Sequence, residues 1–504
     1  MNRQLIILGR VVAATLAVLA FTLFTWLALR YVGQSYFLAD QVDQLQKFEA
    51  LLRLEPEGLL GGAMSGTEAR ALGPFGAIVF GAPVALGFGI NAIHGLTSVF
   101  LVLAAALVFW ELFRLNPAMA WAWLIVFTAM RMVWWNAAMF WVCTLLLPLG
   151  LLELALFAAI LRNPTSLKLT SMTLVLVLAL QVHLVALVGL PVLLLAFVVS
   201  SRRGLRETES ASRGVAHVIV SLLLVASVVP YAAAEGRTNF RNTRAMVSHV
   251  DAAVHSGTSE GRSAALETLV LATDPAGIAP SAAPATVVAV GGLVAFVALL
   301  LAFFRRAGAT SEAEHRHHGS LLWLTLAAAT AIAGQALFFF LMARPINGLH
   351  YAMLLAPWYG VPPAALIASL VPRRGVAGLL VAAVIGIAAV DLLVFRAPSL
   401  ADRYAERTPW NYRAIVTGLD TLCADQAVDT VEGPGLVNEL NPSYYPVLRY
   451  LMKRGFTRCR YEKGSRTLIA GDRDGKFDAS LVSAGRRFTR EEVVAPGLAR
   501  YRAR

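Results

Sequence analysis

The sequence predicts an all-α polytopic membrane protein that carries a small α/β domain at its C-terminal end. Of its 504 residues, 58% are hydrophobic and only 15% are charged, whereas soluble domains average about 25% charged residues. The apolar residues gather into long, nearly uncharged runs, and the composition turns polar after Arg396. A soluble core of this size would instead divide into domains with polar boundaries.

About 11 apolar runs approach the roughly 20 residues that a helix needs to cross a bilayer. Helices suit this position because lipid cannot satisfy a bare backbone amide or carbonyl. The predicted spans are Leu5–Leu29, Ile90–Phe113, Ala118–Met130, Asn136–Ile160, Leu167–Gln181, His183–Ser200, Val215–Ala234, Val288–Phe304, Leu321–Ala343, Tyr351–Val371 and Val376–Phe395.

Basic residues at the ends of these runs predict the orientation, because positively charged loops stay in the cytoplasm. With the N-terminus inside, one side collects Arg3, Arg10, Arg114, Arg162, Lys168, Arg202, Arg203, Arg206, Arg213, Arg305, Arg306, Arg316, Arg373 and Arg374. This arrangement requires that 167–200 form a hairpin of two short helices. The polar regions 34–72, 235–284 and everything after Arg396 then share the outer side of an inner (plasma) membrane.

The net charge of +12 does not indicate nucleic acid, since the arginines are scattered at the ends of apolar runs without a compact basic stripe. The chain also lacks a Walker loop, a Rossmann glycine fingerprint, a GxSxG elbow and an HExxH helix. Cys143 lies inside an apolar run. Cys423 and Cys459 could form a disulfide if their region lies outside the cytoplasm, or remain two free thiols.

Polar residues near the outer ends of the spans are the candidate site residues. Asp40 and Asp43 follow the first span and would share one face of a helix. Such a pair could act as a base and a metal ligand, or belong to a solvated loop. Gln181 and His183 interrupt an apolar stretch. They could contact a phosphate or a leaving oxygen, or cap a hairpin tip.

Arginines supply the candidate phosphate ligands. Arg344 lies in a turn made by Pro345 and Gly348, and arginine binds phosphate well. His350 and Tyr351 follow it, and Arg344 and Tyr351 could equally anchor the turn at the headgroups. The spacing of Arg237, Arg241 and Arg244 predicts one helical face, for a lipid phosphate or for simple headgroup contact.

The order of these features resembles the GT-C superfamily of polytopic glycosyltransferases, which take sugars from polyprenyl-phosphate carriers. The branch that it resembles contains bacterial family-39-like enzymes, related to protein O-mannosyltransferases and the lipid A aminoarabinose transferase. Four stretches carry the likeness: Asp40 after the first span, Gly73-Pro74-Phe75, Gln181-Val182-His183-Leu184, and His350-Tyr351 with Pro357.

The resemblance implies a transmembrane domain over 1–396, with membrane-lying helices in a first outer loop (34–89), a second outer loop (235–284), and an extracytoplasmic domain over 397–504. It implies that Asp40 is the catalytic base. Arg344, His183, His350 and Arg241 would hold the carrier phosphate, with Gln181 and Tyr351 as further substrate contacts. Gln41 replaces the customary glutamate of the family, so Asp43 would have to substitute for it.

The function predicted is transfer of a sugar from a polyprenyl-phosphate carrier to an unknown glycan, lipid or protein acceptor. A divalent metal is left open. The alternatives are a transporter or lipid flippase, which often shows repeats and broken helices at the midplane, and a non-enzymatic membrane scaffold. The C-terminal region should contain helices on 410–419 and Pro442–Arg454, and strands at Val428–Val431 and Thr467–Ala470. It would bind the acceptor, act as a lid, or simply cap the bundle.

Overall fold

The computed structural model describes much of the apolar region and of the C-terminal domain. The predicted span Val288–Phe304 lies outside the described residues, as does Val376–Phe395 apart from position 394. The described residues are 3–33, 37, 39–62, 70–130, 132, 133, 136, 141–205, 211–255, 266, 268, 312–342, 352–370, 394, 411–423, 426–430, 444–471, 477–483, 486–494 and 497–503.

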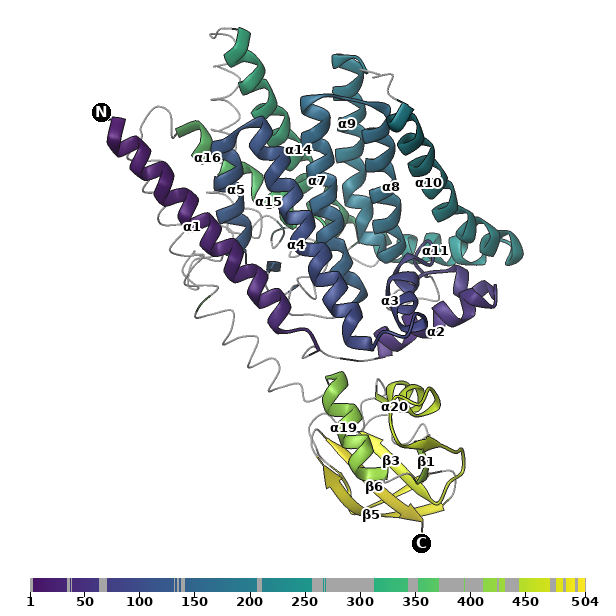
Figure 1. Ribbon diagram of the computed structural model, residues 1–504. Helices are drawn as coiled ribbons and strands as arrows, with labels where there is room; N and C mark the ends of the chain where they lie inside the picture. The colour runs from purple at the N-terminus through teal and green to yellow at the C-terminus, as the bar shows by residue number, and fades with distance from the viewer. Residues whose placement is uncertain are drawn as a thin grey trace.

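The apolar runs form helices that pack into one bundle (Figure 1). Within the described residues, five helical segments are long and apolar enough to cross a membrane, and the others are shorter. The bundle helices are α1 (Arg3–Arg30), α4 (Ile90–Leu115), α5 (Pro117–Ala129), α7 (Leu146–Arg162), α8 (Ser166–Val182), α9 (Leu190–Arg203), α10 (Ala211–Arg237), α14 (Glu312–Met342), α15 (Ala356–Tyr359) and α16 (Val361–Leu370).

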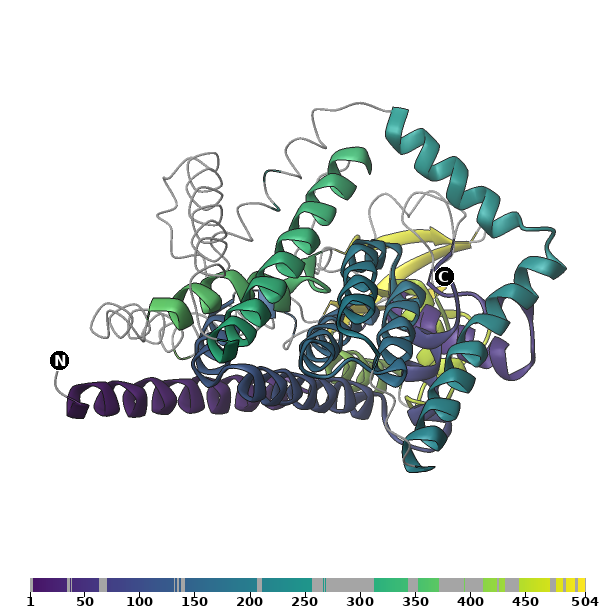
Figure 2. The same ribbon diagram turned by 90° about the horizontal axis from the view of Figure 1, so that it is seen from above.

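Helix α7 is the buried centre of the bundle, and α10 is a peripheral helix. Almost all of α7 is buried, whereas α10 exposes large apolar side chains such as Ile219 and Leu222. Such exposure suits a helix that faces lipid. Seen from above, α1 lies on one side of the bundle and α10 with α11 (Arg241–His255) on the other (Figure 2).

Local sequence sets several helix boundaries. Asn116 caps α5 by accepting a hydrogen bond from the backbone N–H of Met119 at 3.1 Å, and Pro117 occupies the first helical position. Thr165 caps α8 in the same way. At these short polar breaks the chain reverses direction between α4 and α5 and between α7 and α8. Positions 116 and 165 therefore lie at one end of the bundle.

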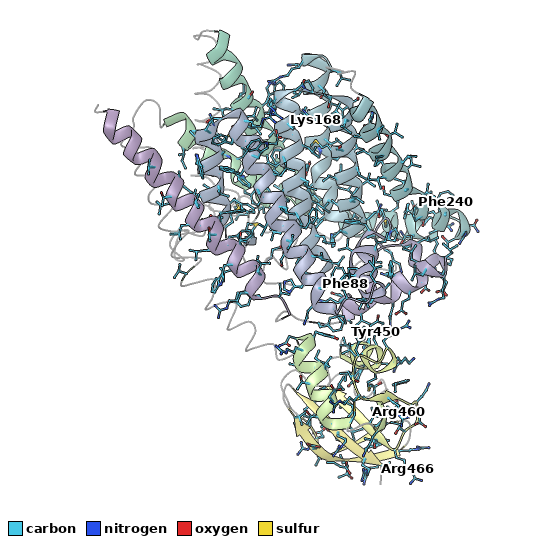
Figure 3. The ribbon with its side chains drawn as sticks, in the orientation of Figure 1. Phe88, Lys168, Phe240, Tyr450, Arg460 and Arg466 are labelled. Carbon is cyan, nitrogen blue, oxygen red and sulfur yellow. A yellow bond between two sulfur atoms is a disulfide. The ribbon has the colours of Figure 1, made fainter. Side chains whose placement is uncertain are left out.

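That end also carries the basic residues expected in the cytoplasm. Arg162 forms an ion pair with Glu111 at 2.9 Å, Lys168 donates to the carbonyl oxygen of Asn163, and Arg203 donates to that of Leu161. Lys168 is marked at this end in Figure 3, far from the C-terminal domain. As predicted, these basic residues therefore lie at the opposite end of the bundle from Asp40 and Gln181.

Two helices connect α1 to α4 at the opposite end. They are α2 (Ala39–Leu52) and α3 (Phe75–Ala85), with a short 3₁₀ turn, η1 (Pro56–Leu59), between them. Neither helix is long enough to cross a bilayer, and both pack beside the ends of the bundle helices (Figure 1). Asp40 and Asp43 therefore lie on a helix, as the spacing argument required.

Three predicted boundaries were wrong. The expected span Tyr351–Val371 is broken, because α15 and α16 are separated at Gly360 and prolines at 357, 362 and 363 interrupt regular helix. The span expected from Asn136 is continuous only from Val142. Helix α10 ends at Arg237, and α11 begins at Arg241 after a turn, so Arg237 does not share a helical face with Arg241 and Arg244.

The hairpin at 167–200 is confirmed. Helix α8 ends at Val182, and a 3₁₀ segment, η3 (Leu184–Gly189), leads into α9. His183 stands between them in an extended conformation and accepts a hydrogen bond at Nδ1 from the backbone N–H of Val185 at 3.1 Å. The polar pair Gln181 and His183 therefore lies at the tip of this hairpin.

Within its described residues, the C-terminal domain is a six-stranded sheet with two helices. The strand order is β2-β1-β3-β6-β5-β4, with β1 parallel to both β2 and β3 and the remaining pairs antiparallel. The elements are α19 (Tyr412–Cys423), β1 (Ala427–Thr430), α20 (Tyr444–Lys453), β2 (Arg460–Tyr461), β3 (Thr467–Gly471), β4 (Ser480–Ser483), β5 (Arg486–Val494) and β6 (Leu498–Ala503).

The predicted helices and strands of this domain are confirmed within a few residues. Ile415 and Leu419 are fully buried on one face of α19, and Gly455 ends the second helix with a positive φ of 70°. Cys423 and Cys459 form a disulfide between the end of α19 and the segment before β2. Strands β2, β4, β5 and β6 were not predicted, because β2 and β4 are short and charged residues interrupt the apolar alternation of β5 and β6.

Candidate functional site

Asp40 lies in the first turn of α2. Its Oδ2 accepts a hydrogen bond from the indole Nε1 of Trp141, shortly before α7, at 3.0 Å. The residue is exposed to solvent, yet desolvation by the surrounding side chains raises the pKa of Asp40 above its ordinary value. The hydrogen bond from Trp141 and the charge of Lys47 act in the opposite direction, and Asp43 adds to the rise. Asp40 is therefore an oriented carboxyl group with a raised pKa.

Asp43 lies one turn later and pairs with Lys47. The Lys47 Nζ is 2.5 Å from Oδ2 of Asp43 and also donates to the carbonyl oxygen of Gly61 at 2.6 Å. Lys47 is only 4% exposed. Burial lowers its pKa, and the charge of Arg70 acts in the same direction, while Asp43 and Asp40 raise it. Two acids and one arginine therefore act on a single buried ammonium group.

Close backbone contacts hold this loop against the hairpin tip. A Cβ atom on Gly61 would lie 2.8 Å from the carbonyl oxygen of Gly73 and 2.9 Å from that of Gln181. A Cβ on Gly73, which has a φ of 153°, would lie 2.6 Å from Cδ of Gln181. Only glycine permits these approaches, so the two glycines bring Gln181 beside the carbonyl group that Lys47 contacts.

The side chain of Gln181 joins three elements. Its Oε1 accepts a hydrogen bond from the backbone N–H of Phe75 at 3.1 Å, and its Nε2 donates to the carbonyl oxygen of Ser227 at 2.7 Å. Gln181 is 2% exposed. These bonds tie α8 to the start of α3 and to α10, so the geometry gives Gln181 a positioning role beside the acids.

Arg70 is the functional candidate that the sequence analysis missed. Its backbone N–H donates to Oδ1 of Asn242 at 2.7 Å, and its carbonyl oxygen accepts from Nδ2 of Asn242 at 3.0 Å. Asn242 follows Arg241 at the start of α11. This double hydrogen bond brings the first polar loop and the second one together, although the residues are 172 positions apart.

Arg70 and Arg241 line the same pocket. It has a volume of about 660 Å³, and its other lining residues are Glu55, Pro56, Glu57, Leu60, Thr238, Asn242 and Ala245. Glu55 is paired with Arg53 at 2.6 Å. Two guanidinium groups beside hydroxyl, amide and carboxylate groups could hold a phosphate and the hydroxyl groups of a sugar.

The remaining predicted residues fall into two groups. His183 lies at the hairpin tip and keeps Nδ1 occupied by the N–H of Val185. Arg344, His350 and Tyr351 lie outside the described residues. The structure therefore connects Asp43 with Gln181 through Lys47 and Gly61, whereas Arg241 lies with Arg70 on a pocket whose lining includes neither Asp40 nor Asp43. In the part of the chain that the structure describes, no group of three or more His, Cys, Asp or Glu side chains is arranged to hold a metal.

Several partners in the site carried only weak signals in the sequence. Lys47 is four residues after Asp43 on the same helix, a spacing typical of an ion pair. The Gly61-Gly62 and Gly73-Pro74 pairs indicated close turns. Nothing in the sequence paired Trp141 with Asp40 or Asn242 with Arg70, because those contacts span 101 and 172 positions.

An acid inside the bundle was also missed. Glu153 lies in the middle of α7 and is 1% exposed. Its carboxyl group lies near the indole N–H of Trp358, but the two do not meet strict hydrogen-bond geometry. A carboxyl group within an apolar run is a recognisable signal. It lies at membrane depth, away from the polar loops that form the site.

Comparison with known proteins supports the fold assignment. No protein-family model and no curated protein matches this chain. Among solved structures, the chain is similar to ArnT from Cupriavidus metallidurans, in a crystal structure with bound undecaprenyl phosphate. The TM-score is 0.51, the sequence identity is 12%, and the match covers 96% of this chain and 97% of that one.

The chain has a fold similar to that of ArnT over nearly its whole length. The resemblance stated from the sequence is thereby confirmed at the level of architecture, including the helical membrane region and the small C-terminal sheet domain. At 12% identity the likeness to ArnT concerns the fold. The chemistry of this chain follows from its own side chains.

Proposed function

We propose that this chain is a membrane glycosyltransferase that moves a sugar from a polyprenyl-phosphate carrier to an acceptor outside the cytoplasm. The observation that carries the proposal is that Arg70 and Arg241 line one pocket. Asp40 and Asp43 lie outside that lining, and Lys47 is within electrostatic range of both acids and of Arg70. A glycosyl phosphate needs this combination: cations for the phosphate and a carboxylate for the acceptor. The ArnT structure with a similar fold contains undecaprenyl phosphate, which supports the choice of carrier.

The reaction follows from these groups. An acceptor hydroxyl oxygen attacks the anomeric carbon, and its proton passes to the Asp40 carboxylate. The bond between the anomeric carbon and the phosphate oxygen breaks, and its electron pair leaves with the phosphate. The leaving phosphate gains negative charge, which Arg70 and Arg241 stabilise more in the transition state than in the ground state. Asp40 contributes as a general base.

The other polar groups have supporting roles in this proposal. Lys47 holds Asp43 and the Gly61 carbonyl group, and so fixes the loop between the acids and Arg70. Gln181 positions the hairpin tip. His183, and Arg344, His350 and Tyr351 outside the described residues, stay predicted contacts of the carrier phosphate or the sugar. A metal ligand role for Asp43 stays open.

Two observations support an extracytoplasmic site in an inner (plasma) membrane. Disulfides persist in oxidising compartments, and Cys423 and Cys459 are bonded in the domain at this end of the bundle. The basic residues Arg162, Lys168 and Arg203 lie at the other end, which the positive-inside rule places in the cytoplasm. The N-terminus would then be cytoplasmic.

The test is binding of undecaprenyl phosphate to the purified full-length chain in nanodiscs, measured by native mass spectrometry. We expect Arg70→Ala and Arg241→Ala each to weaken binding about tenfold or more, because each removes a charged phosphate contact. Arg244→Ala is the matched control, since Arg244 is exposed on α11 and does not line the pocket. Undecaprenol, which lacks the phosphate, should bind weakly to every variant.

The alternatives predict other results. A scaffold would bind undecaprenyl phosphate no better than undecaprenol. A transporter or flippase could bind the lipid but would move it across the membrane without breaking the sugar–phosphate bond. Equal binding by the wild-type chain and both pocket variants would show that Arg70 and Arg241 do not bind the carrier phosphate.

A further inference from the structure

The outer edge of the C-terminal domain is strongly basic. Residues 449–466 contain seven lysines and arginines and a single acid, Glu462. They form the second half of α20, the edge strand β2 and the turn into β3. Arg454 pairs with Glu49 of α2. The other six cations are called here the basic edge: Arg449, Lys453, Arg458, Arg460, Lys463 and Arg466.

Most of the basic edge is open to solvent. Lys453, Arg458, Arg460 and Arg466 are exposed, and none of these four forms an ion pair within the described residues. Along the whole sequence the positive charge is scattered. The sheet concentrates it here because β2 lies at the edge of the sheet, directly beside the end of α20.

An aromatic ring lies within the cationic surface. The Lys453 Nζ is 4.9 Å from the ring centroid of Tyr461, and the Arg449 Cζ is 5.6 Å from it. Tyr461 is half-buried. An aromatic ring stabilises cations placed over its face, so Tyr461 fixes two positive charges at a defined spacing. It also offers an apolar edge beside them, which suits a ring-shaped partner better than a bare ion.

The basic edge leads away from the membrane region. Figure 3 shows Tyr450 at the junction with the bundle, and Arg460 and Arg466 progressively farther from it. Tyr450 and Arg454 both contact Glu49 at that junction. The field of lipid headgroups falls off within a Debye length, about 8 Å at physiological salt. The attraction of the host membrane's headgroups therefore weakens along the basic edge, from the junction toward Arg466.

Protection of the edge strand β2 against pairing with other chains does not account for these cations. An exposed strand edge is commonly guarded by a single lysine or another charge. Strand β2 is only two residues long, and most of the basic edge lies on the flanking helix and turn. A run of one sign over three elements repels itself, and an anionic partner would relieve that repulsion.

We propose that the basic edge binds an acidic glycan outside the membrane, with carboxylate or phosphate groups repeated along its length. The repeated anions would meet the successive cations from Lys453 to Arg466, and a sugar ring would lie against Tyr461. A role of this glycan as the acceptor rests on the proposed transferase function, but its binding does not. The surface would then hold the polymer at the same end of the helical bundle as Asp40.

Binding is tested on the full-length chain in nanodiscs of neutral lipid, by biolayer interferometry with immobilised polymers. The probes are polygalacturonate for carboxylate, inorganic polyphosphate for phosphate, dextran as a neutral glycan, and double-stranded DNA. We expect binding to at least one of the first two, none to dextran, weaker binding to DNA, and a loss with rising salt. The preferred probe distinguishes carboxylate from phosphate.

A pair of matched variants tests the location. The triple variant Lys453→Gln, Arg460→Gln and Arg466→Gln should bind about tenfold or more weakly, since each cation near an anionic surface contributes. The control triple variant Arg413→Gln, Arg487→Gln and Arg490→Gln removes the same charge from exposed sites elsewhere on the domain, and should bind like the wild type. Equal melting temperatures and an intact disulfide show that both fold.

Four results would overturn the proposal. They are no binding to either acidic polymer, equal binding to dextran, equal losses in the two triple variants, and DNA binding as tight as that of the acidic glycans. None of these readouts depends on sugar transfer, so failure here and failure of the transferase proposal are distinguishable.

Discussion

The indole N–H of Trp141 donates to the Asp40 carboxylate at 3.0 Å, across 101 positions of sequence. This bond connects the start of α2 with the segment that leads into α7, the buried centre of the bundle. It favours the charged form of Asp40, whereas burial favours the neutral form. Trp141 therefore orients the proposed base. It also lowers the pH at which the Asp40 carboxyl group loses its proton.

Replacing Trp141 with phenylalanine should shift the acid limb of the pH–rate profile. The proposed base works only when deprotonated, so activity falls as the pH drops through the pKa of Asp40. Loss of the hydrogen bond removes an influence that lowers this pKa, and the limb should move to higher pH. The measurement is kcat/KM against pH for transfer from the lipid-linked sugar. Trp26→Phe, at an exposed position on α1, is the control; an unmoved limb in Trp141→Phe would argue against Asp40 as the titrating base.

Replacing Lys47 with methionine should destabilise the loop that holds the acids. Lys47 is buried and contacts Asp43 and the Gly61 carbonyl oxygen. Its removal leaves both without a partner, at a cost of about 2 kcal/mol after allowing for the partial exposure of Asp43. The free energy of unfolding in detergent should fall by that amount. A melting temperature equal to that of the wild type would mean that Lys47 is not a structural support.

The buried carboxyl group of Glu153 should make the bundle less stable than an apolar residue would. A poorly paired polar group costs about 1–3 kcal/mol when buried, and the nearby indole N–H of Trp358 does not meet strict hydrogen-bond geometry with either Glu153 oxygen. Glu153→Leu should therefore raise the melting temperature without lowering transfer. If Glu153→Leu loses transfer while Glu153→Gln retains it, the side chain has a polar role at membrane depth that the site described above does not include.

Removal of the disulfide should destabilise the C-terminal domain. The two cysteines are 36 positions apart, and cross-linking a loop of that length is worth about 3–4 kcal/mol in the chain-entropy model. Cys423→Ser with Cys459→Ser should become sensitive to limited proteolysis in this domain. Alkylation of the wild-type chain from cells, without reduction, should modify neither cysteine. Full modification of both thiols would contradict an oxidising location.

Much of the fold was predictable because membrane helices have a distinctive sequence pattern. Runs of apolar residues, arginines at their ends and the polar hairpin tip at Gln181 and His183 each have a direct physical cause. The span 351–371 was mispredicted since hydropathy does not register how prolines at 357, 362 and 363 interrupt a helix. Strands β5 and β6 were missed because arginines and glutamates interrupt the alternation of the apolar residues that face the core.

The site was only partly predictable. Asp40 and Asp43 could be placed on one helical face from spacing alone, and Arg241 could be named as a candidate phosphate ligand. Arg70 could not, because its importance comes from two hydrogen bonds with Asn242, far along the chain. Likewise, the basic edge becomes compact only when β2 pairs beside the end of α20. Local patterns predict elements, whereas sites made by distant contacts need the folded chain.

The most direct test of the central claim is sugar transfer by Asp40→Asn. The purified chain in nanodiscs is incubated with polyprenyl-phosphate sugars and an envelope extract as the acceptor source, and loss of the sugar–phosphate bond is followed. Asp251→Asn, at an exposed position of α11, is the matched control. We predict cleavage by the wild type and the control, a loss of about 100-fold or more in Asp40→Asn, and unchanged binding of undecaprenyl phosphate. Wild-type cleavage by Asp40→Asn would contradict the account.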